Sequence, residues 1–281
     1  MIYFGPSGND EDFYAQGFKH TTEAGPWLKK MGLNAYEYAF TRGVNISDDK
    51  AIEIGNIMRE NGIEVSAHAP YYINLANPDD EMASKSFGYI ISSLNKLKLM
   101  GGTHLVVHIG SMGKLTRDEA LSLIRKRLEI LKNLIIQNDL TDMFVCIETM
   151  GKPAQIGTYE EIIDLCTMYD RFMPTFDFGH INSLTGGTLK TSEDYRKIID
   201  LCYEKLGKYR TNNVHIHFSK IQYGDKGEIR HLTFEDDIYG PEFEPLAVIL
   251  KEYKMQPMII CESRGTQTKD ALAMKYIYEN C

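Results

Sequence analysis

Residues 104–149 read HLVVHIGSMGKLTRDEALSLIRKRLEILKNLIIQNDLTDMFVCIET. Two short runs rich in β-branched and aromatic residues, at 104–109 and 143–149, flank a segment at 117–137 in which apolar residues recur every three or four positions. The runs are typical of buried strands and the segment between them of an amphipathic helix. This order predicts two parallel strands joined by a crossover helix.

The same alternation continues along the whole chain, with further helical patterns at residues 48–61, 84–100 and 159–169. Strand-like runs lie at residues 2–5, 34–40, 64–69, 104–109, 143–149, 173–178, 213–218 and 256–262. Eight strand–helix units in 281 residues predict a (β/α)8 TIM barrel that forms a single domain over residues 1–281. An open doubly wound sheet is the alternative, but the glycine-rich turn typical of its first strand is not found. The longest irregular segment, 219–241, follows the seventh strand.

Composition and charge limit the class of protein. Hydrophobic residues make up 43% and charged residues 25% of the chain, as in an average globular protein. The five cysteines form no CxxC pair, and no long apolar run is present. We therefore expect a cytoplasmic monomer without a membrane partner. The net charge of -8 argues against a wholly basic DNA-binding surface, but bound metal ions can supply local positive potential.

Metal-binding residue types lie at the ends of six consecutive predicted strands. TIM barrels place their active sites at this rim. A buried carboxylate is costly unless it is paired, and imidazole plus carboxylate without thiolate suits a catalytic zinc site. A lone histidine at such a position is more often structural, so the argument depends on the whole set. The set consists of His68, His108, Glu148, Asp177 with His180, His215, and Glu262.

Six ordered motifs extend this pattern: SAHAPYYINLAN (66–77), LVVHIGS (105–111), CIETMGK (146–152), TFDFGHIN (175–182), VHIHFSK (214–220) and IICESRG (259–265). Together they resemble the endonuclease IV family of abasic-site endonucleases, which are three-zinc TIM-barrel enzymes of base-excision repair. The resemblance implies hydrolysis of double-stranded DNA on the 5' side of abasic sites. It also implies that a metal-bound hydroxide attacks the phosphodiester, with Glu148 and Glu262 as catalytic residues.

The resemblance further implies three zinc sites. The first has His68, His108 and Glu148 as ligands; the second has Glu148, Asp177, His215 and Glu262; the third has His180 with Glu228 and His231. At the third site the usual Asp-x-His becomes Glu-Ile-Arg-His, which adds one residue of spacing. The other interpretation of this segment is a solvated loop.

Four residues are predicted to contact the substrate. Tyr71 aligns with the aromatic residue that the family inserts beside the lesion, although it can equally pack under the rim. Arg230 is expected to point toward the substrate phosphates, and Arg42 is the basic residue that remains in the segment after the second strand, which contacts DNA in the family. His217 lies on the same strand face as His215 and is a substrate contact, a partner of a ligand, or a substitute ligand.

Two other functions remain open. A metal-dependent sugar isomerase or epimerase could use the same type of barrel, but such sites are richer in carboxylates and poorer in imidazoles. A non-catalytic metal-binding module is the second alternative; it would have no need for an open coordination position.

Overall fold

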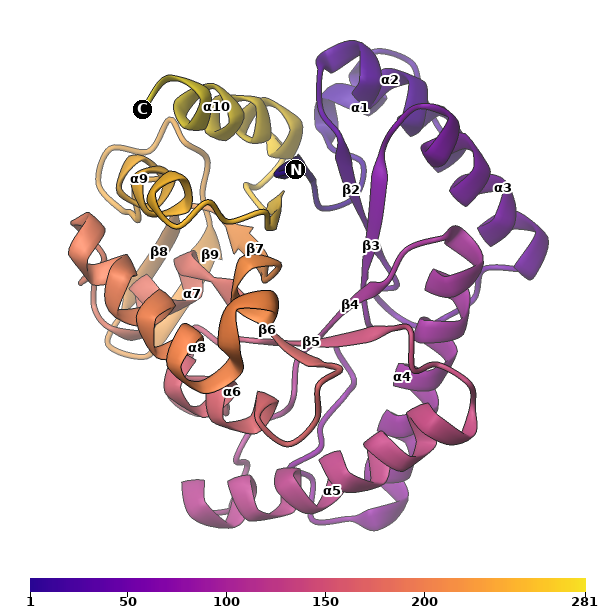
Figure 1. Ribbon diagram of the computed structural model, residues 1–281, viewed down its shortest axis with the longest axis vertical. Helices are drawn as coiled ribbons and strands as arrows, with labels where there is room; N and C mark the ends of the chain where they lie inside the picture. The colour runs from indigo at the N-terminus through magenta and orange to yellow at the C-terminus, as the bar shows by residue number, and fades with distance from the viewer.

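Eight parallel strands form one sheet in the order β1-β10-β7-β6-β5-β4-β3-β2 in the computed structural model, which describes residues 1–281. A parallel bridge between Ser7 and Glu37 joins the two edges of this sheet, β1 and β2. The predicted (β/α)8 barrel is confirmed (Figure 1). The barrel strands are β1 (Tyr3–Pro6), β2 (Ala35–Ala39), β3 (Glu64–His68), β4 (His104–Val107), β5 (Phe144–Glu148), β6 (Phe172–Asp177), β7 (His215–Phe218) and β10 (Met258–Cys261).

Helices surround the strands on the outside of the barrel (Figure 1). Polar caps fix where several of them begin: the Thr116 and Thr158 hydroxyls accept hydrogen bonds from backbone N–H groups of the first helical turns. No helix combines the length and the apolar character needed to cross a membrane. The helices are α1 (Glu11–Ala15), the 3-10 helix η1 (Thr21–Glu23), α2 (Ala24–Met31), α3 (Asp48–Glu60), α4 (Asp80–Met100), α5 (Arg117–Gln137), α6 (Tyr159–Cys166), α7 (Phe178–Leu184), α8 (Ser192–Asn212), α9 (Glu244–Glu252) and α10 (Gln267–Asn280).

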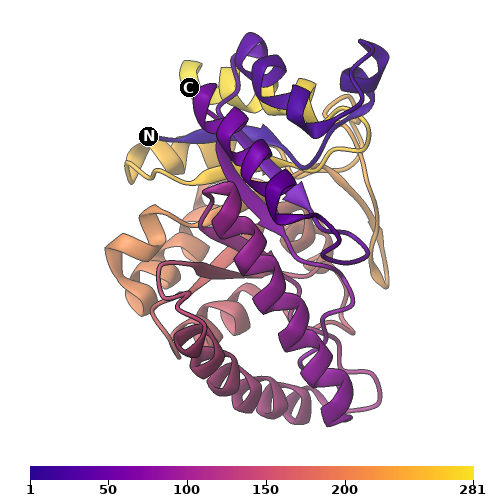
Figure 2. The ribbon, with the colours of Figure 1, turned by 90° about the vertical axis from the view of Figure 1, so that its right-hand side faces the viewer.

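The segment after β7 is more regular than the sequence pattern indicated. Within residues 219–241, which we expected to be irregular, β8 (Ile221–Gly224) and β9 (Gly227–His231) form an antiparallel hairpin. The hairpin extends along one side of the barrel (Figure 2). It has its own two-stranded sheet and is not part of the barrel wall.

Side chains alternate along the barrel strands between the interior and the helices. On β5, Cys146 packs with Val106 and Met173 in a small interior cluster, whereas Val145 and Ile147 belong to the main core. By this alternation Glu148 faces inward, two positions after Cys146. Below the rim the barrel interior therefore contains apolar clusters together with a few buried polar side chains, including Glu37 and His215, and further polar side chains lie at the carboxyl ends of the strands.

Candidate metal centre

Acidic and imidazole side chains gather at the carboxyl ends of the barrel strands. His68, Glu148 and Asp177 are the last residues of β3, β5 and β6. His108 directly follows β4, and Glu262 directly follows β10. The structure thus brings these five predicted side chains together at one rim, where they belong to clusters whose ligand atoms lie within 4.8 Å of one another.

The first cluster contains His68, His108 and Glu148. Glu148 Oε2 lies 3.1 Å from His68 Nε2 and 2.8 Å from His108 Nε2. The other ring nitrogen of His68, Nδ1, lies 2.8 Å from the carbonyl oxygen of Ala69, so it donates a hydrogen bond there and leaves Nε2 directed at the cluster. Burial lowers the pKa of His68, but the Glu148 carboxylate outweighs it and raises the pKa to about 9.

The second cluster contains Glu148, Asp177, His217 and Glu262. His217 Nδ1 lies 3.2 Å from Glu148 Oε1 and 3.5 Å from Glu262 Oε2. The resemblance implied His215 in this cluster, and the structure places His217 there instead. Glu148 belongs to both the first and the second cluster, as the resemblance implied.

The register of the strands explains this correction. Asp177, at the end of β6, pairs with His217, whereas His215 pairs with Thr175. Two residues of a strand span about 6.6 Å along its axis, so His215 lies deeper in the barrel than His217. There its Nε2 lies 2.9 Å from Glu37 Oε2, and the side chain does not reach the rim.

The second cluster concentrates three carboxylates in buried surroundings. Burial and the neighbouring Glu148 raise the pKa of Glu262. Burial acts in the same direction on Glu148, but the imidazoles of His108 and His217 hold its pKa well below the usual value. Asp177 Oδ2 is buried and has no hydrogen-bond partner. A divalent cation among these oxygens would satisfy Asp177 and offset the repulsion, so the residues present fit a metal ion.

The third cluster contains His180, Glu228 and His231. Glu228 Oε2 lies 3.5 Å from His180 Nε2, and Glu228 Oε1 lies 3.8 Å from His231 Nε2. The Nδ1 atoms of the two histidines have other partners: the Thr149 carbonyl oxygen at 2.9 Å from His180 and the Ser219 hydroxyl at 2.8 Å from His231. Both Nε2 atoms therefore face the glutamate, which is the arrangement that a metal ion requires.

A β-bulge in β9 compensates for the unusual spacing of the third cluster. Glu228 and Arg230 pair with consecutive residues of β8, so Ile229 between them has no partner. In a regular strand, residues three positions apart point to opposite faces. Because the bulge adds one residue, Glu228 and His231 turn to the same side. The longer spacing noted in the sequence is thus compatible with the cluster.

The three clusters meet at one cavity of about 320 Å³. Lys152 also lines this cavity, with Nζ 4.0 Å from Glu228 Oε2. Lys152 has no role predicted from the sequence, although it lies in the motif at 146–152, four residues after the predicted ligand Glu148. It brings a positive charge to a wall that is otherwise acidic and imidazole-rich.

The predicted substrate contacts have different environments. Tyr71 lines the cavity and is 54% exposed, so it does not pack under the rim. Arg42 and Arg230 are exposed and lie outside the cavity wall, and Arg230 Nε donates a hydrogen bond to Gln222 Oε1. His217 is fully buried and does not line the cavity, because its ring lies between carboxylates on both sides. Of the three roles that the sequence leaves open for His217, its position in the second cluster favours that of a substitute ligand over a substrate contact.

The family model of the xylose isomerase-like TIM barrel matches residues 26–278 of the chain. The chain belongs to this family. An uncharacterised protein of Methanocaldococcus jannaschii is 31% identical over 88% of this chain and 88% of its own length. The probable endonuclease 4 of Acholeplasma laidlawii is 32% identical over 62% of this chain, and the match spans 60% of that relative.

Solved structures of two functional classes share the fold. Endonuclease IV from Thermus thermophilus has a TM-score of 0.73 and 18% identity, and the match covers 99% of this chain and 100% of that chain. A D-tagatose 3-epimerase-like protein has a TM-score of 0.71 and 17% identity, with coverages of 99% and 96%. At these identities the likeness establishes the barrel and does not distinguish between the two activities.

Proposed function

We propose that this protein is a zinc-dependent phosphodiesterase that cleaves double-stranded DNA on the 5' side of abasic sites. The observation that carries the proposal is the convergence of three acid–imidazole clusters on one open cavity, with Glu148 common to two of them. The similarity to the probable endonuclease 4 of Acholeplasma laidlawii supports the same activity.

The donor set suits zinc, because it combines imidazoles and carboxylates without thiolates. Bound zinc would supply an acidified water and positive charge that stabilises the transition state of phosphodiester hydrolysis. The residues that would hold the three ions are His68, His108 and Glu148; Glu148, Asp177, His217 and Glu262; and His180, Glu228 and His231.

Individual side chains have distinct roles in this proposal. Glu148 directs one carboxylate oxygen at the first cluster and the other at the second, so it would be a ligand common to both sites. Glu262 lines the cavity, where its carboxylate can orient the attacking water. Lys152 lies at the cavity wall and Arg42 on the surface nearby, where they can bind phosphate oxygens.

The charge balance of the site favours an anionic substrate. The three clusters contain five imidazoles and four carboxylates in total. Three divalent ions bound by neutral imidazoles would leave a net charge of about +2. With the three ions bound, a phosphate would be attracted to this cavity although the whole chain has a net charge of -8. An abasic nucleotide is also the easiest to extrude from a duplex, because its pairing is already lost.

A metal-dependent sugar epimerase or isomerase is the second candidate. The second cluster favours it, because three carboxylates and one imidazole can hold a single divalent ion that polarises a carbonyl group. That function leaves the imidazoles of the first and third clusters without a role. A non-catalytic metal-binding module does not account for the open cavity at the clusters.

The two enzyme functions can be separated in one comparison. The protein is incubated with an end-labelled duplex that contains one abasic site, with the matched intact duplex, and with a series of ketoses. We expect a single cut on the 5' side of the lesion, no cut in the intact duplex, and no change in the sugars. Epimerised sugar together with intact DNA would establish the second candidate and reject the first.

Tyr71 gives a prediction about lesion recognition. We propose that its ring stacks in the gap left by the extruded nucleotide, because it is 54% exposed at the edge of the cavity. Stacking contributes about 1–3 kcal/mol, so Tyr71→Ala is expected to weaken binding of abasic duplex by roughly 5- to 150-fold and binding of intact duplex much less. Fluorescence anisotropy with both duplexes measures the two affinities.

Tyr72 is the matched control for this prediction. It is also 54% exposed, and its ring centroid lies 6.1 Å from that of Tyr71, but it does not line the cavity. Tyr72→Ala should therefore change the two affinities by similar factors. Equal losses on both duplexes for Tyr71→Ala would show that Tyr71 has no role specific to the lesion.

A further inference from the structure

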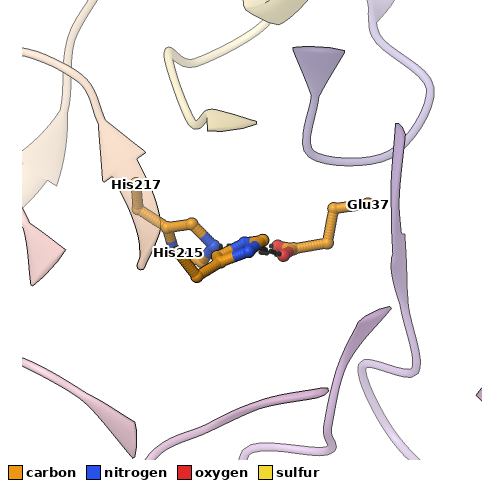
Figure 3. Close-up of side chains that lie close together, drawn as sticks. All are labelled: Glu37, His215 and His217. Carbon is orange, nitrogen blue, oxygen red and sulfur yellow. Dashed lines mark hydrogen bonds and ion pairs between the residues drawn. The ribbon is translucent and has the colours of Figure 1, made fainter. Parts of the chain in front are cut away.

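Glu37 is a buried carboxylate that sequence reasoning did not connect with the metal centre. It lies in the middle of β2 and extends into the barrel toward His215 and His217 on β7 (Figure 3). All three side chains are fully buried. His217 Nε2 lies 3.1 Å from Glu37 Oε1 and 3.2 Å from Oε2, with hydrogen-bond geometry toward Oε2.

The two ring nitrogens of His217 therefore face different carboxylates. Nε2 faces Glu37, and Nδ1 faces Glu148 and Glu262 of the second cluster. An ionised carboxylate only accepts hydrogen bonds, so the contact with Glu37 fixes a proton on Nε2. The lone pair of Nδ1 is then available for a cation. His68 has the same arrangement, but its partner is the backbone carbonyl oxygen of Ala69.

Glu37 is itself held in place from several directions. Its Oε2 accepts hydrogen bonds from His215 Nε2 at 2.9 Å and from the Ser66 hydroxyl at 3.1 Å. Its backbone carbonyl oxygen accepts a hydrogen bond from Gly8 N at 2.9 Å, at the junction of β1 and β2. The carboxylate is thus fixed between β3 and β7, and the ring of His217 is fixed with it.

A metal ion bound directly by Glu37, His215 and His217 is the competing explanation, because their ligand atoms also lie within 4.8 Å of one another. None of the three side chains lines the cavity at the rim, and all three are fully buried, so substrate in the cavity would not reach an ion held there. Three donors, from two imidazoles and the Ser66 hydroxyl, converge on Glu37 Oε2, which therefore needs no ion, whereas Oε1 has no hydrogen-bond partner and lies 3.1 Å from His217 Nε2.

We propose that Glu37 is a positioning residue, which orients His217 so that Nδ1 points at the carboxylates of Glu148, Asp177 and Glu262, and thereby raises the affinity of the second cluster for a divalent cation. The inference rests on the proposed metal centre. Carboxylates that orient a ligand histidine in this way typically contribute about 10- to 100-fold to metal affinity.

The test measures metal binding and does not depend on catalysis. Metal-free protein is titrated with zinc against a chromophoric chelator, and separately with cobalt, whose visible absorption reports the ligand geometry. Glu37→Gln is expected to bind the second-cluster ion about 10- to 100-fold more weakly, with a changed cobalt spectrum and the same number of ions at saturation. Glu37→Asp keeps the charge and should recover part of the affinity.

Ser66→Ala is the matched control, because it removes another hydrogen bond to the same carboxylate and leaves the contact with His217 intact. Its zinc affinity should stay within about threefold of the wild type. Unchanged affinity and an unchanged cobalt spectrum in Glu37→Gln would overturn the proposed role of Glu37 and leave the proposed function of the protein untouched. Loss of one whole equivalent at saturating zinc would also overturn it, because Glu37 would then be a ligand. A wild-type protein without an ion at the second cluster would refute the proposed function as well.

Discussion

Replacing Glu148 with glutamine is expected to reduce kcat/KM for a duplex with one abasic site by about 1000-fold or more. Removing a single electrostatic donor from an active site costs roughly 10²–10³-fold, and this change affects two clusters at once. Glu148 Oε2 lies within 3.1 Å of His68 and His108, and Oε1 lies 3.2 Å from His217. Glutamine keeps the size of the side chain and removes the charge that two cations would share. Steady-state kinetics and elemental analysis of bound metal provide the two measurements.

The barrel of the Glu148→Gln variant should remain folded, because the change lies at the rim and not among the apolar side chains of the core. Circular dichroism and thermal unfolding check this point. Glu262→Gln should also abolish cleavage, since Glu262 lines the cavity. Glu160→Gln, on the exposed surface of α6, is the control and should keep wild-type activity. Near-normal turnover of Glu148→Gln with its full metal content would contradict the proposed mechanism.

Prolonged treatment with a chelator is expected to remove essentially all cleavage activity. Zinc should restore it and magnesium should not, because magnesium prefers oxygen ligands in octahedral geometry and the three clusters include five imidazoles. Activity on abasic duplex is measured before chelation, after it, and after addition of each metal.

The chelation experiment also shows which of the three clusters the activity requires. Recovery with magnesium would mean that the carboxylate-rich second cluster is sufficient for activity, since it offers three carboxylates and one imidazole. The first and third clusters would then need another explanation. A thermal unfolding curve of the chelated protein serves as the control, because loss of activity through unfolding would not be reversed by zinc alone.

The barrel could be predicted from the sequence because its signals are local. Each strand-like run and each helical pattern depends on residues a few positions apart, and β5 with its neighbour α5 follows the pattern at 104–149 closely. The hairpin after β7 was missed, although Gly224 and Gly227 frame a two-residue turn between two short runs.

The choice between His215 and His217 could not be made in the same way. Both residues face the barrel interior, because they lie two positions apart on one strand. Which of them reaches the rim depends on how β7 pairs with β6, where Asp177 lies beside His217. That register is a property of the closed barrel and has no signal in the local sequence.

Glu37 and Ile229 illustrate the same limit. A glutamate inside the run at 34–40 looks like an ordinary polar residue of a strand, and only its burial against His215 and His217 reveals its connection with the rim. The bulge at Ile229 depends on the pairing of β9 with β8. The motifs identified which side chains gather at the rim, but the positions of their atoms followed from the pairing of distant strands.

The most direct test of the central claim is X-ray diffraction from crystals of the native protein at the zinc absorption edge. We predict three anomalous peaks at the rim. One lies beside His68 and His108, one beside His217 Nδ1, and one beside His180 and His231, with Glu148 contacting the first two. A single peak confined to the second cluster, or no zinc at the rim, would contradict the trinuclear centre on which the proposed DNA cleavage depends.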